Sequence, residues 1–203
     1  RINAEPVRLG GDVGLGHVLQ RRVDAEIDAL IAIARRQPRQ IFEPGDEIGA
    51  AIGAGCDLAM MCDIRIAAEG ATFGVWEAKR GLFPLGGSAV RLPRQIPYTL
   101  AMEVLLACRP VSAQEALAIG LIGRVVPDGD ALKVAMEVAL EVAQNSPVST
   151  KAILRAWRET EGLSDAEAMK IQDAIGWEVF ASEDAQEGPR AFSEKRPPEF
   201  KGR

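Results

Sequence analysis

The sequence predicts an α/β domain followed by a region made only of helices. From Ala50 onward, short extended segments alternate with helical patterns, and glycines and prolines separate them. After about residue 129 only helical patterns remain. A chain of 203 residues that is 47% hydrophobic and 26% charged can bury a substantial core. We therefore expect a core over residues 1–128 and a helical region over residues 129–203.

The first well-defined element of the core is a helix over residues 53–61. It opens on small residues and stays small and apolar nearly all round, which indicates a buried helix. Residues 63–68 alternate in polarity like a strand, and residues 71–73 continue extended after a turn. A glycine-rich loop follows over residues 81–87.

Helical patterns dominate the rest of the chain. The pattern that begins after Val111 has Ser112 and Glu115 in the spacing of a capping box. Residues 121–127 predict a short strand or an extended exit from this helix. The final stretch, 188–203, is charged and contains prolines. The expected helices cover residues 97–108, 112–119, 129–144, 148–160 and 164–182.

The residues before Ala50 fit no clear pattern of an α/β core. Residues 17–36 have helical spacing, and the glycines and prolines on either side indicate loops. No ladder of core strands is recognisable there. Either this part is rich in loops, or the sequence joins segments that are not contiguous in the natural polypeptide.

Composition excludes several classes of function. The net charge is −5 and no basic run is long enough to follow a phosphate backbone, so we expect no nucleic-acid partner. No apolar run is long enough to span a bilayer, and the first residues, Arg-Ile-Asn-Ala-Glu-Pro, lack the order of basic and then apolar residues that a secretion signal has. With three cysteines and a single histidine, His17, we expect neither a metal site nor a Ser-His-Asp triad. The prediction is a cytoplasmic protein whose chemistry uses carboxylates and backbone groups.

The candidate chemistry lies in one window of the sequence. Small residues at the start of the helix, Gly53 to Gly55, let a ligand approach N–H groups that have no partner within the helix. Asp57 lies one turn inside this helix, and Glu77 follows twenty residues later. Two carboxylates beside a helix N-terminus suit acid/base work next to an oxygen that gains negative charge. Each feature also has a structural alternative. The small residues permit tight packing of the helix, Asp57 interacts with the helix dipole, and Glu77 is a solvated loop residue.

Two segments of this window resemble the central signature of the crotonase (enoyl-CoA hydratase/isomerase) superfamily. They are residues 51–68, which contain Gly-Ala-Gly-Cys-Asp-Leu-Ala-Met-Met, and residues 71–84, which contain Trp-Glu-Ala-Lys-Arg-Gly. The likeness continues in order over about three quarters of the chain. Its further segments are Gly86-Gly87, residues 91–93, 111–116, 120–122, 125–127, 182–188 and 191–197.

The resemblance implies a ββα spiral with a helical C-terminal region that forms a trimer, or a dimer of trimers. It implies an acyl-CoA thioester as substrate and no separate cofactor, because coenzyme A is part of the substrate. Ala54 takes the place of one backbone donor to the thioester oxygen. The segment of the second donor has no counterpart, and its expected place is near Asp28.

Asp57 and Glu77 match the two glutamates with which the family's hydratases add water across the 2,3-double bond. Asp57 is one methylene shorter than the family pattern, whereas Glu77 matches it in type and spacing. Gly53, Trp76 and Phe83 are expected at the substrate, with plain core packing as the alternative for the two aromatic rings. Phe192 and Lys195 match positions that contact the adenine and phosphates of coenzyme A. Their alternative is a helix end with a solvated charge.

Three hypotheses for function follow from the resemblance. The first is an enoyl-CoA hydratase that acts through Glu77 with Asp57 assisting. The second is an enoyl-CoA isomerase of the same fold that needs one carboxylate and the oxyanion donors. The third is a catalytically silent homologue that binds acyl-CoA.

Overall fold

The computed structural model describes residues 50–203. Our expectations for residues 17–36 and for the second oxyanion segment near Asp28 concern residues outside this range. The chain forms two compact units that divide after Ala139. Each unit is described by itself.

Five short strands organise the first unit. The strand β1 pairs in parallel with β3, so that Ala51 lies opposite Phe73 and Ile52 opposite Gly74. On its other edge β3 pairs antiparallel with β4, and a separate parallel pair joins β2 to β5. Their bounds are β1 Ala50–Ile52, β2 Ile66–Ala68, β3 Thr72–Gly74, β4 Val111–Ser112 and β5 Arg124–Val126.

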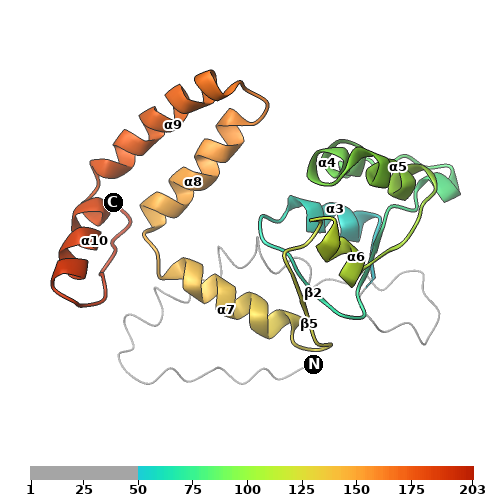
Figure 1. The fold of residues 1–203 in the computed structure, drawn as a ribbon, viewed down its shortest axis with the longest axis horizontal. Helices are drawn as coiled ribbons and strands as arrows, with labels where there is room; N and C mark the ends of the chain where they lie inside the picture. Colours follow the sequence, from blue (N-terminus) through green and yellow to red (C-terminus); the bar gives the residue numbers. More distant parts are fainter. Residues whose placement is uncertain (1–49) are drawn as a thin grey trace. The chain divides into compact units, whose positions relative to one another are not determined.

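The helices of this unit alternate with the strands along the chain, which confirms the expected α/β class (Figure 1). The helix expected over residues 53–61 begins at Ala54 and ends at Met61. Its bounds and those of its neighbours are α3 Ala54–Met61, η1 Ala78–Arg80, α4 Ser88–Gln95, α5 Tyr98–Leu106 and α6 Ala113–Ala118.

The sequence pattern did not predict α4, because this helix is short, polar and contains Pro93. It forms where Ser88 and Leu92, one turn apart, are buried in the first unit. The side-chain amide of Gln95 also donates to the main-chain oxygen of Met60 at 3.1 Å, which joins the end of α4 to α3. Tertiary burial therefore outweighs the weak local propensity of this segment.

The core of the first unit lies between these helices and β3. Its largest fully buried side chains include Phe73, Val75, Leu92 and Val111. The inner residues of α3, Cys56 and Met60, belong to the same cluster. All three cysteines of the chain are buried and free.

Only half of the expected capping box forms at α6. The Ser112 side chain accepts the Glu115 N–H at 3.2 Å, as the sequence predicts. The Glu115 carboxylate, however, pairs with the Arg109 guanidinium at 2.8 and 2.9 Å instead of reaching back to the helix start. This hydrogen bond lowers the pKa of Glu115. A charge-assisted pair is the stronger interaction for a carboxylate, which explains why Glu115 pairs with Arg109 and does not complete the capping box.

The second unit is helical. The helix α7 (Ala131–Ala143) contains the boundary between the units, and α8 (Pro147–Thr160) and α9 (Asp165–Phe180) form a hairpin (Figure 1). These three elements lie within two residues of the expected helices at each end. A further helix, α10 (Glu183–Ser193), follows, although Gly188 and Pro189 within it are poor helix formers. Across residues 50–203, no helix is both long and apolar enough to cross a membrane.

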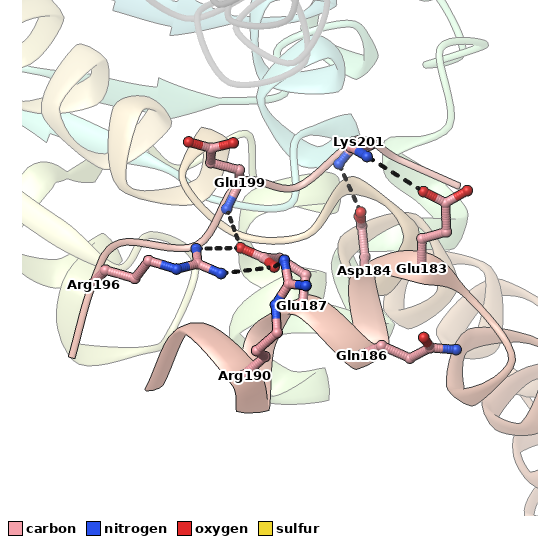
Figure 2. Close-up of a pocket in the computed structure, with 8 residues that line it drawn as sticks. All are labelled: Glu183, Asp184, Gln186, Glu187, Arg190, Arg196, Glu199 and Lys201. Atoms are coloured by element: carbon pink, nitrogen blue, oxygen red, sulfur yellow. Dashed lines mark hydrogen bonds and ion pairs between the residues drawn. The ribbon is translucent and has the colours of Figure 1, made fainter. Parts of the chain in front are cut away.

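The carboxylate of Asp184 holds the end of the chain against α10. This side chain is 3% exposed, and it accepts the Ser146 hydroxyl at 2.8 Å and the Lys201 N–H at 2.7 Å. The Gly202 N–H also donates to it, at 3.1 Å from each oxygen. Figure 2 shows Asp184 below Lys201, beside the group that Glu187 forms with Arg190 and Arg196. One buried carboxylate therefore joins the start of α8, the start of α10 and the C-terminal segment.

We expect Asp184→Asn to lower the free energy of unfolding by about 3 kcal/mol, because an amide cannot replace a carboxylate that accepts hydrogen bonds from several buried donors. Urea unfolding of the full chain measures the change. The control is Asp173→Asn, since Asp173 is exposed on α9 and its substitution should cost less than about 0.5 kcal/mol. Equal costs for the two variants would contradict the role of Asp184.

Candidate active site

The start of α3 lies at the carboxyl edge of the parallel pair β1–β3. Gly53, which directly follows β1, donates its N–H to the Gly74 oxygen at 2.9 Å and has a left-handed φ of +56°. Among residues 50–203, no side chain caps this helix start. Ala54 is exposed and is the first helical residue, so its N–H has no acceptor within the helix. The positive end of the helix dipole is thus available to an anion or a polarised oxygen.

The Glu77 carboxyl group lies directly against this helix start. A Cβ atom added to Gly53 would lie 2.8 Å from Glu77 Oε1. The other oxygen, Oε2, is buried and has no hydrogen-bond partner within residues 50–203. The backbone of Glu77 is fixed, because its oxygen accepts the N–H groups of Arg80 at 2.9 Å and Leu82 at 3.0 Å. Glu77 therefore combines a fixed backbone with a buried carboxyl oxygen that has no hydrogen-bond partner in residues 50–203.

Asp57 lies on the same face of α3 as Gly53. The Asp57 N–H donates to the Gly53 oxygen at 3.0 Å, so the two residues are one turn, or about 6 Å, apart along the helix. Side chains on a helix lean toward its N-terminus, so the Asp57 side chain leans toward the Gly53 end of α3. The structure thus places Ala54 and Asp57 in the first turn of one helix, and it places Glu77 against the start of that helix.

The environment of Asp57 differs from that of Glu77. Asp57 is only 6% exposed, and its Oδ1 accepts both the Ser88 N–H, at 2.9 Å, and the Ser88 hydroxyl. Ser88 itself is completely buried. The Asp57 carboxylate is therefore hydrogen-bonded to the first turn of α4, and the dipole of its own helix, α3, also favours its negative charge.

Sequence reasoning missed Ser88 and treated Gly86 only as part of a loop. The two residues contact the two oxygens of Asp57, because a Cβ atom on Gly86 would overlap Asp57 Oδ2. The available signal was the Gly-Gly-Ser run, in which small residues permit close approach and serine supplies a donor at a helix start.

Cys56, which lies between the helix start and Asp57, is not a nucleophile. Burial raises the pKa of its thiol to about 12, and the charges of Asp57 and Glu77 act in the same direction.

Within the described part of the chain, no group of three or more His, Cys, Asp or Glu side chains could hold a metal ion.

The two aromatic residues near Glu77 have different surroundings. Trp76 is half-buried, lies over Gly74, and has the Lys79 ammonium 5.6 Å from its ring centroid. Phe83 is 67% exposed, so core packing is the wrong explanation for this residue. Its neighbours Leu82 and Leu85 are exposed as well, at 62% and 90%. The loop after Glu77 thus presents apolar side chains that the first unit does not cover.

Phe192 and Lys195 lie in the second unit, whereas the two carboxylates lie in the first. Phe192 is 87% exposed at the end of α10. Lys195 has a left-handed φ of +54°, and its N–H donates to the Phe192 oxygen at 3.2 Å. The next residue, Arg196, donates to Ala191 at 3.1 Å, which completes a Schellman motif. Lys195 therefore terminates a helix, in agreement with the structural alternative.

Comparison with known proteins identifies the family. Residues 48–203 match the family model described as enoyl-CoA hydratase/isomerase. The chain is 51% identical over 179 residues to "Enoyl-CoA hydratase EchA19" of Mycobacterium tuberculosis, which covers 88% of this chain and 66% of the relative. It is 36% identical to "2,3-dehydroadipyl-CoA hydratase" of Escherichia coli, with coverage of 76% and 61%.

Solved structures show the same relationship. An enoyl-CoA hydratase/isomerase of Mycobacterium abscessus superposes with a TM-score of 0.75 at 32% identity and covers 93% of both chains. The crystal structure of an enoyl-CoA hydratase from Mycobacterium tuberculosis gives a TM-score of 0.74 at 37% identity, with coverage of 76% and 61%.

The chain belongs to the enoyl-CoA hydratase/isomerase family, and it has the crotonase fold that the sequence resemblance implied. It spans 66% of the length of the Mycobacterium tuberculosis relative and 61% of the Escherichia coli one.

We expect Gly53→Ala to lower turnover of an enoyl-CoA thioester by about tenfold or more, because the new methyl group would lie 2.8 Å from Glu77 Oε1 and would push that carboxyl out of position. The left-handed φ of Gly53 adds a backbone penalty of about 1 kcal/mol.

The matched control is Gly120→Ala, at a φ of +79° with open space around the new Cβ atom. It should show a similar loss of stability and nearly normal turnover. Initial rates and thermal unfolding are measured for both variants. An equal loss of turnover in both would show that the contact between Gly53 and Glu77 is not the cause of the loss.

Proposed function

We propose that this chain is part of an enoyl-CoA hydratase, which adds water across the 2,3-double bond of an acyl-CoA thioester. One observation carries the proposal: the Glu77 carboxyl lies against the uncapped start of α3 and keeps a buried oxygen, Oε2, without a partner in residues 50–203. A buried, unpartnered carboxyl oxygen beside free helix N–H groups is costly for stability and suits a bound substrate.

The proposed role of Ala54 is electrostatic. Its exposed N–H would donate to the thioester oxygen, and the dipole of α3 would stabilise the negative charge that this oxygen gains as the double bond reacts. Because the donor is a backbone group, a methyl side chain at this position leaves the chemistry unchanged. Gly53 would keep the approach to the helix start open.

The two carboxylates would divide the proton transfers between them. Asp57 would accept a proton from the water whose oxygen bonds to C3, and Glu77 would give a proton to C2. Exchange with solvent would then return a proton to Glu77 and remove one from Asp57, which closes the cycle. Their different environments support this division, since Asp57 accepts two hydrogen bonds from Ser88 whereas Glu77 Oε2 accepts none from residues 50–203.

The names of the relatives support hydration, since the Mycobacterium tuberculosis and Escherichia coli proteins are both described as hydratases. One observation favours isomerisation as the second candidate: Asp57 Oδ1 accepts hydrogen bonds from Ser88, whereas Glu77 Oε2 has no hydrogen-bond partner in residues 50–203. A single base of this kind could move a proton from C4 to C2 of a 3-enoyl-CoA.

We further propose which residues bind the substrate. Trp76 and Phe83 would contact the acyl chain, because Trp76 directly precedes Glu77 and the exposed Phe83 follows Leu82, whose N–H donates to the Glu77 oxygen. Phe192 and Lys195 would contact the adenine and phosphates of coenzyme A. The enzyme would need no cofactor beyond the coenzyme A of its substrate. Its free, buried cysteines support a cytoplasmic location.

Replacement of the Glu77 carboxylate tests the proposed activity. We expect Glu77→Gln to lower kcat on crotonyl-CoA by about 10² to 10⁴, the usual contribution of a general acid or base, with nearly unchanged binding. Loss of the absorbance of the conjugated thioester measures turnover, and calorimetry with a saturated acyl-CoA measures binding. The control is Glu69→Gln, because Glu69 is exposed in a turn. Normal turnover in Glu77→Gln, or equal loss of turnover and binding, would contradict the assignment.

We also propose that residues 1–128 form the catalytic core and that residues 129–203 form a helical region for assembly into a trimer or a dimer of trimers. The hairpin α8–α9 supports assembly, because it exposes large apolar side chains along a groove of about 720 Å³. Ile153 is 67% exposed, Trp157 66%, Trp177 73% and Phe180 73%. The sequence places an apolar stripe on these helices, and one of its members, Ile175, is buried inside the hairpin. The stripe consists of Ile153, Leu154, Trp157, Leu163, Ala168, Ile171 and Ile175. Exposed apolar patches of this kind are typical of interfaces.

Light scattering tests the assembly. The unchanged chain should have three or six times the mass of one chain at micromolar concentration, and Trp157→Glu should shift it to smaller species, because a charge cannot be buried unpaired in an apolar interface. The control is Lys170→Gln, which changes the net charge by the same amount at an exposed position of α9. A monomeric unchanged chain would rule out the proposed trimer.

A further inference from the structure

A buried contact joins Ser88 to Asp57 across 31 residues of sequence. The Ser88 N–H donates to Asp57 Oδ1 at 2.9 Å, and the Ser88 hydroxyl donates to the same oxygen. Ser88 is 0% exposed and Asp57 is 6% exposed, so bulk water does not compete for these hydrogen bonds. One oxygen of the carboxylate is therefore committed to Ser88.

Steric contact restrains the other oxygen, Asp57 Oδ2. It lies against Gly86, where any Cβ atom would overlap it. With Ser88 on one oxygen and the backbone of Gly86 against the other, the plane of the carboxylate is fixed. A free aspartate would rotate about two side-chain bonds, and such rotation would spread Oδ2 over several positions.

We propose that Ser88 is a positioning residue for hydration: by occupying Oδ1 of Asp57 it aims Oδ2 at the attacking water. This inference rests on the proposed hydratase activity, and it assigns to Ser88 no contact with substrate. Orientation matters here because a reacting group displaced by about 1 Å can lose about a hundredfold in rate. Glu77 does not depend on this contact, since its main-chain oxygen accepts the N–H groups of Arg80 and Leu82 and its carboxyl group lies against Gly53.

Two reactions of the same site separate the role of Ser88 from a general effect on structure. Hydration of crotonyl-CoA needs the oxyanion donor, Glu77 and a water held by Asp57. Exchange of a C2 proton of butyryl-CoA with D₂O needs the oxyanion donor and Glu77 but adds no water at C3. A variant that affects only the aim of Asp57 therefore slows the first reaction and spares the second.

The variant Ser88→Ala removes the hydroxyl and keeps the main-chain N–H. We expect kcat for hydration to fall at least tenfold, with KM and the exchange rate on butyryl-CoA within about twofold of the unchanged chain. In an Asp57→Asn background the same substitution should cause no further loss, because Ser88 acts through Asp57. If Ser88→Ala does not fold, Ser88→Cys, which fills the position with a weaker donor, is measured in the same two assays.

The matched control is Ser112→Ala, which removes a serine hydroxyl from another helix start of the first unit, where it accepts the Glu115 N–H. It should cost about 1 kcal/mol of stability and leave both reactions unchanged. Thermal unfolding of each variant accompanies the rates.

Three results would overturn the role of Ser88 alone. They are normal hydration in Ser88→Ala, an equal fall of hydration and exchange, and a further fall when Ser88→Ala is added to Asp57→Asn. An unchanged chain that exchanges the C2 proton but does not hydrate crotonyl-CoA would overturn the proposed hydratase, and the role of Ser88 with it.

Discussion

The hydrogen bond from the Gly53 N–H to the Gly74 oxygen determines where the start of α3 and the segment that contains Glu77 lie in the candidate site. It extends the parallel pairing of β1 and β3 one residue past Ile52, at the point where both strands end. The segment after β1 turns into α3 at Ala54, and the segment after β3 reaches Glu77 three residues after Gly74. Because the two exits share one edge, a helix N-terminus and a carboxylate that are far apart in the sequence lie in contact. A left-handed Gly53 makes the sharp turn from strand to helix possible.

The sequence was informative where local signals determine the structure. The small residues at 53–55, the capping serine at 112 and the periodic helices after residue 129 predicted elements that the structure contains within a few residues. The helix α4 was not predicted, and of α10 only its end near Phe192 and Lys195 was an alternative, since each helix contains a proline and forms through burial of only a few residues. The Gly-Gly-Ser run indicates close approach and a donor at residues 86–88, but its partner Asp57 depends on how α4 packs on α3, which no local pattern encodes.

The assignment of residues shows the same division between local and long-range information. Ala54, Asp57 and Glu77 could be proposed from the sequence because each is tied to one helix start or its neighbouring turn. For Lys195 the spacing alone left binding and helix termination open, and the backbone shows termination by a Schellman motif. A lysine in a left-handed conformation is uncommon, since glycine has the lowest cost there. The two roles are compatible, because the motif uses the backbone of Lys195 and leaves its exposed side chain available.

The depth of the Cys56 side chain has a chemical consequence for an enzyme of this kind. The proposed substrate is an α,β-unsaturated thioester, and such molecules alkylate thiolates by conjugate addition at C3. Cys56 adjoins Asp57, so a reactive thiolate there would consume the substrate and inactivate the enzyme. Burial raises the pKa of this thiol to about 12, so it stays protonated near neutral pH, and its 1% exposure denies access to the sulfur. Burial thus lets a cysteine remain next to the proposed catalytic carboxylates without self-alkylation.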